Sequence, residues 1–102
     1  MELPAYIEFL VKSGLPVSML YEDGYITYDL NTGMKSSALL SVREGEIHIK
    51  MRYGIANITP SDDVSHTVKE IVHTVGAHCM YGRTYALSKW FDLFEMFEFD
   101  QY

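Results

Sequence analysis

The chain has a single cysteine, Cys79, and no long apolar run. One cysteine cannot form an intrachain disulfide, which is typical of a protein from a reducing compartment. No stretch reaches the roughly 20 apolar residues that a membrane-spanning helix needs. The first residues also lack the basic start and apolar run of a signal peptide. We therefore expect a cytoplasmic protein.

Motifs that commit a chain to a particular chemistry are also missing. The seven glycines form neither GxGxxG nor the GxxxxGK[ST] phosphate loop. Cysteine and histidine do not recur at the spacing that a structural zinc site requires. We expect no metal, no cofactor and no enzymatic activity.

Basic residues are few, with eight Lys and Arg against fourteen Asp and Glu, and the formal net charge is -6. Affinity for nucleic acid depends on bases that neutralise phosphates, so direct nucleic-acid binding is not expected. The deficit is greatest at the C-terminal end, where no lysine or arginine follows Lys89.

The rest of the composition is that of an ordinary folded domain. The 102 residues are 48% apolar and 22% charged, close to the average for globular proteins. A chain of this size buries roughly 65% of its unfolded surface, enough for one core without disulfides or metals. We expect residues 1–102 to form a single globular domain.

The N-terminal half predicts one helix followed by two hairpins. Pro4 and Gly14 are suited to the first turn and the stop of a helix over residues 4–13. Asp23-Gly24 and Glu44-Gly45 predict two-residue hairpin turns. In the registers that these turns set, apolar residues collect on one face, which we expect the helices to cover. This face consists of Val17, Met19, Tyr21, Ile26, Tyr28, Leu30, Leu40, Val42, Ile47, Ile49 and Met51.

The C-terminal half predicts two more helices. Thr59 can be the N-cap of one, with Pro60 at its first helical position and Gly76 ending or bending it. Thr84 can cap another, whose apolar stripe runs to Phe97. Together the elements predict an α+β domain in which a four-stranded antiparallel meander is covered on one face by three helices, in the order α-β-β-β-β-α-α.

The segment after Lys89 is the least ordinary part of the chain. It holds more large apolar residues than one buried helix face accommodates, and acids crowd its last turn, where the helix dipole favours cations. We expect it to be an interaction surface that contacts a basic partner or a second copy of the chain. Its members are Asp92, Glu95, Met96, Glu98, Phe99, Asp100 and Tyr102.

A smaller basic patch is predicted on the outer face of the second hairpin, formed by Arg43, His48, Lys50 and Arg52. Such a patch could meet a phosphate, RNA or an acidic partner. Alternating charges are also typical of any solvated strand face. The outward positions of the central strands lack the aromatics that stack on RNA bases, which counts against an RNA site.

These observations favour a small acidic interaction protein that binds another protein with a basic surface. In one form it inhibits that protein, by analogy with small viral inhibitors that place carboxylates where phosphates would lie. One alternative is a small enzyme or ligand-binding domain that uses His66, His73, His78 and Cys79. The other is an oligomer-forming structural protein.

Overall fold

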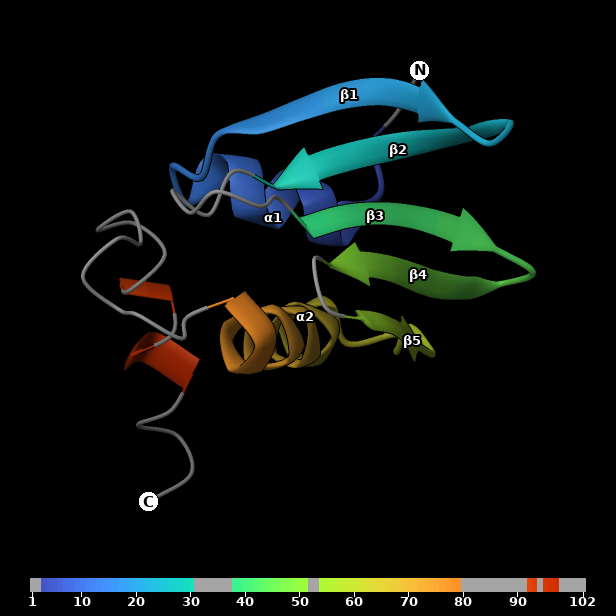
Figure 1. The fold of residues 1–102 in the computed structure, drawn as a ribbon. Coiled ribbons are helices and arrows are strands. Elements are labelled where there is room, and N and C mark those ends of the chain that lie inside the picture. The colour runs from blue at the N-terminus through green and yellow to red at the C-terminus, as the bar shows by residue number, and fades with distance from the viewer. Residues whose placement is uncertain (1–2, 31–37, 52–53, 80–91, 94, 98–102) are drawn as a thin grey trace.

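In a computed structural model the chain forms an antiparallel sheet with helices packed behind it (Figure 1). The structure describes residues 3–30, 38–51, 54–79, 92, 93 and 95–97. The elements follow in the order α1 (Ala5–Lys12), β1 (Val17–Glu22), β2 (Tyr25–Leu30), β3 (Ala38–Arg43), β4 (Glu46–Met51), β5 (Gly54–Ile58) and α2 (Val64–Cys79). Residues 92, 93 and 95–97 are helical as well.

The predicted α+β class and antiparallel meander are confirmed, but the predicted number of strands is wrong. The sheet has five strands in the order β1-β2-β3-β4-β5. The missed strand, β5, pairs with β4 from Met51 opposite Gly54 to Ile47 opposite Ile58. Of the predicted third helix, the part from Thr84 to residue 91 lies outside the described residues.

Both hairpin turns have the geometry that their sequences predict. The φ angles are 54° at Asp23 and 85° at Gly24, and 52° at Glu44 and 80° at Gly45. Positive φ at both central positions defines a type I′ turn, whose twist matches that of the flanking strands. The predicted registers are confirmed by the pairs that follow, with Met19 opposite Tyr28 and Leu40 opposite Ile49.

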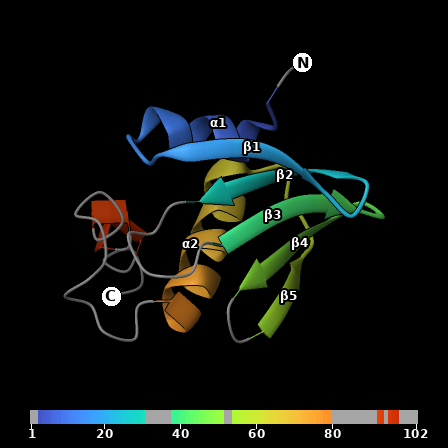
Figure 2. The ribbon, with the colours of Figure 1, turned by 45° about the horizontal axis from the view of Figure 1, so that its top comes forward.

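The core lies between the inner face of the sheet and the two helices, which share one side of it (Figure 2). Each fully buried aliphatic side chain stabilises the fold by roughly 1.5–3 kcal/mol relative to an exposed one. The strands contribute Leu30, Leu40, Ile47 and Ile49, and the helices contribute Ile7, Leu10, Val68, Ile71, Val72 and Val75, all nearly inaccessible to solvent.

The turn ends of both hairpins project beyond the helices, as Figures 1 and 2 show. Three residues of the predicted buried face are exposed: Met19 by 58%, Tyr21 by 73% and Val42 by 47%. Tyr21 and Val42 are close to the turns, and Met19 is in the middle of β1. The prediction that helices cover these three was wrong. Tyr28 opposite Met19 and Ile47 opposite Val42 are buried, so the cover of the inner face differs between paired strands. Val17 and Ile26 are partly buried against the core.

The inner-face register predicts a clear ranking of two neighbouring substitutions on β4. Ile49 is fully buried and Lys50 is exposed. Ile49→Ala should destabilise the fold by roughly 2–5 kcal/mol, since it leaves a cavity in the core. Lys50→Ala should leave the free energy of unfolding close to that of the parent. Urea unfolding of both variants measures the difference, and the reverse ranking would contradict the register.

A second prediction concerns Tyr6 on α1. Burial, with a smaller contribution from Tyr28, raises the pKa of Tyr6 from 10.0 to about 12. The neutral phenol therefore favours the folded state, and its contribution is complete below pH 10 and lost as the pH rises toward 12. Tyr6→Phe should lose less stability than the parent over this range. Urea unfolding at several alkaline pH values tests this, and equal losses in both proteins would count against it.

Candidate functional site

The described part of the C-terminal segment has one buried side and one exposed side. Leu93 and Phe97 are almost fully buried, and the ring centroid of Phe97 lies 6.4 Å from that of Phe9 on α1. Asp92 and Glu95 are exposed, and Met96 is exposed by 46%. Leu93 and Phe97 thus fix this short helical piece to the core, with its acids and methionine turned to solvent. Glu98, Phe99, Asp100 and Tyr102 lie outside the described residues.

Four acids elsewhere in the described structure lie within ion-pair distance of a base: Glu8, Glu22, Asp23 and Glu70. Glu8 lies 2.8 Å from Lys12, Glu22 lies 2.9 Å from Lys50, and Glu70 lies 2.9 Å from His66. Within the described ranges, neither Asp92 nor Glu95 has an ion pair or a side-chain hydrogen bond. Both side chains are exposed, so a partner can reach them.

The predicted basic patch is on the outer face of the sheet, but its charges are used within the molecule. Lys50 Nζ donates a hydrogen bond to Glu22 Oε1, which raises the pKa of Lys50 above its ordinary value. The Arg43 guanidinium lies 4.4 Å from the centre of the Tyr25 ring, and its Nε donates to Ser41 Oγ at 3.0 Å. His48 is half-buried. Arg52 lies outside the described residues.

The contact between Lys50 and Glu22 joins β4 to β1 across the two strands between them. In a flat sheet those strands would be about 14 Å apart, so the contact needs long side chains and a curved outer face. Figure 2 shows the strong twist of the sheet. Thr27 and Ser41, on the central strands, are only 2% exposed. In its described part, the outer face is thus closed over small polar residues, and the charges of Lys50 and Arg43 are engaged within the molecule.

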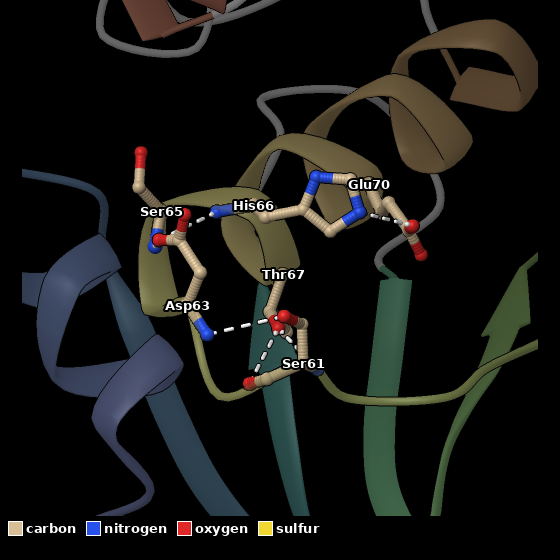
Figure 3. Close-up of polar contacts among 6 residues, drawn as sticks. All are labelled: Ser61, Asp63, Ser65, His66, Thr67 and Glu70. Atoms are coloured by element: carbon tan, nitrogen blue, oxygen red, sulfur yellow. Dashed lines mark hydrogen bonds and ion pairs between the residues drawn. The ribbon is translucent and has the colours of Figure 1, made fainter.

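The start of α2 is held by a set of side-chain hydrogen bonds (Figure 3). Asp63 Oδ1 accepts the N–H groups of Ser65 at 3.0 Å and His66 at 3.4 Å, so Asp63 is the N-cap. Thr67 Oγ1 accepts the N–H of Ser61 at 2.9 Å. The prediction of Thr59 as the cap was wrong, because β5 continues to Ile58 and the Thr59 hydroxyl donates to Glu46 instead.

The alternative site that the sequence suggested consists of four residues of α2: His66, His73, His78 and Cys79. His66 is exposed and its Nε2 lies 2.9 Å from Glu70 Oε1. His73 is two turns further along and half-buried. His78 and Cys79 are in the last turn of α2, and their side chains lie outside the described part. Among the described residues there is no group of three or more His, Cys, Asp and Glu side chains placed to hold a metal ion.

Sequence reasoning missed the exposed apolar surface of β1. Met19 and Tyr21 are exposed on the inner face, and Leu20 is exposed by 37% on the outer face. The short length of the first helix could have indicated this, because the eight residues of α1 span about 12 Å, which is less than the length of a six-residue strand.

No helix among the described residues is long and apolar enough to cross a membrane.

Comparison with protein-family models, with curated proteins and with solved structures found no match to this chain.

The cap of α2 provides a test of the local geometry. Asp63→Ala should destabilise the fold by about 0.5–2 kcal/mol, because two N–H groups of the first turn lose their acceptor. The matched control is Asp62→Ala, which removes the same charge from an exposed neighbour without the cap. Thermal and urea unfolding compare the two. Equal destabilisation by both substitutions would show that charge, and not capping, holds this end.

Proposed function

We propose that this is a small acidic, non-enzymatic protein that acts by binding another protein with a basic surface. The binding surface is the outward side of the C-terminal segment. Its described members are Asp92, Glu95 and Met96, and the sequence adds Glu98, Phe99, Asp100 and Tyr102.

The observation that supports this most directly is the exposed Met96 beside two exposed acids, Asp92 and Glu95, on an anchored helical piece. Exposed apolar groups supply the burial that stabilises a complex, and acids around them steer a basic partner and suppress acidic ones. Because Leu93 and Phe97 hold the described part of the segment to the core, Asp92, Glu95 and Met96 are presented in a fixed orientation. Less ordering entropy is then lost on binding than for a free tail.

The distribution of charge supports the same choice of partner. Residues 60–102 hold seven of the fourteen acids but three of the eight bases. On the sheet, Lys50 and Arg43 are occupied by Glu22, Tyr25 and Ser41. Of the acids in residues 60–102, Asp92 and Glu95 are exposed on the C-terminal segment, and a partner with exposed lysine or arginine complements them.

The test is a pair of charge reversals, Asp92→Lys with Glu95→Lys. Tagged parent and variant are incubated with lysate of the source cell, and the retained proteins are identified by mass spectrometry. Affinities for the recovered partner are then measured at low and moderate salt. We expect the variant to bind at least about tenfold more weakly, with the parent's binding falling steeply as salt increases.

The matched control is Glu44→Lys with Asp62→Lys, which makes the same change in net charge at two exposed acids elsewhere. It should bind as the parent does, and unfolding curves should show that both variants fold. Unchanged binding by the C-terminal variant, or an equal loss in the control, would overturn the proposed surface.

A further inference from the structure

Strand β1 is an edge of the sheet with large apolar side chains exposed on both of its faces. It is the first strand in the order β1-β2-β3-β4-β5, and its outer side faces away from the other strands (Figure 1). Met19 and Tyr21 are exposed by 58% and 73% on one face, and Leu20 is exposed by 37% on the other. The other edge strand, β5, exposes one large apolar side chain, Ile55.

The hairpin register shows which backbone groups of β1 are unused. Across a two-residue turn the flanking residues, here Glu22 and Tyr25, form a hydrogen-bonded pair. By alternation, Leu20 and Ser18 also bond to β2. The N–H and C=O groups of Val17, Met19 and Tyr21 therefore point to the free edge, and no described strand pairs with them.

Natural sheets protect such edges with lysine, proline, bulges or inward-pointing charges. β1 has none of these over its six residues, and its pairing with β2 is continuous. Its one ionised side chain, Glu22, lies at the end of the strand and is already paired with Lys50. The middle of the edge strand is therefore uncharged and mostly apolar. It offers no opposite charge to the side chains of a highly charged peptide.

We propose that β1 pairs antiparallel with β1 of a second copy of the chain, about a two-fold axis at Met19. In this register Met19 lies opposite the partner's Met19, and Val17 lies opposite the partner's Tyr21. About six backbone hydrogen bonds form, all from groups that face the free edge. The exposed side chains of the inner face then pack against each other.

The charged side chains of β1 itself do not oppose this pairing. The two Glu22 residues lie at opposite ends of the joined strands, about 20 Å apart along the strand direction. That separation exceeds the screening length of about 8 Å at physiological salt. Each Glu22 also keeps its own Lys50. A two-fold axis uses the same surface on both copies, so the association stops at a dimer.

Light scattering and sedimentation velocity over a concentration series test the association. The parent should shift with concentration from the 11.7 kDa chain toward twice that mass. Met19→Lys and Tyr21→Lys should abolish the shift, because lysine blocks an edge. Ile55→Lys, the matched control on β5, should leave it intact. A monomeric parent at all concentrations, or a dimer that survives both β1 substitutions, would overturn the proposal.

Disulfide trapping tests the register without depending on affinity. In a Cys79→Ser background, Met19→Cys places two thiols in a pair whose Cα atoms are about 5.5 Å apart, within disulfide range. Tyr21→Cys places them about 13 Å apart. We expect covalent dimers from the first variant under mild oxidation, and few from the second. Equal yields from both would contradict the pairing, and unfolding curves confirm that each variant folds.

Discussion

The two type I′ turns, at Asp23-Gly24 and Glu44-Gly45, set the register on which the rest of the structure depends. A slip of one residue in either hairpin would move every inner side chain to solvent. With the register fixed, Leu40 and Ile49 stand opposite each other on the inner face and are buried. The apolar stripe of α2 packs on this face, and the Asp63 cap holds the start of that helix. The hairpin turns, the buried core and the cap of α2 are therefore all compatible with one strand register and one position of α2 on the sheet.

The same register also creates the exposed surface. Alternation places Met19, Tyr21 and Val42 on the inner face together with Ile49, but these three side chains are not covered. What is exposed there is a direct continuation of the core face, and this explains why its side chains are so apolar. Single exposed apolar residues are common on protein surfaces, whereas neighbours on one edge strand with free backbone groups are not.

Much of the architecture follows from short-range sequence signals, and the failures have physical causes. The hairpins could be predicted because Asp-Gly and Glu-Gly turns and strict alternation indicate one register. β5 could not, because its glycine, alanine and asparagine are weak strand formers and its pairing with β4 depends on the assembled sheet. The cap of α2 was misplaced because Thr59-Pro60 and Asp63 both fit a helix start, and only β5 decides between them.

Periodicity identified the inner face of the sheet, but it does not say how far a helix extends over that face. For the candidate site, the apolar stripe predicted to run to Phe97 ends in a buried Phe97, and the predicted surface residues Asp92, Glu95 and Met96 are exposed.

The two proposed surfaces are compatible with each other. The described C-terminal residues and the hairpin turns lie at opposite ends of the molecule in both views (Figures 1 and 2). A pair of chains joined at β1 would therefore keep both C-terminal surfaces accessible. Two copies of an acidic surface on one rigid sheet bind a partner with two basic sites more tightly than either does alone, because the second contact forms at high effective concentration. Edge pairing would then strengthen weak charge-based recognition without any new contact at the C-terminal segment. The size of that gain depends on whether the spacing of the partner's basic sites matches the fixed distance between the two surfaces.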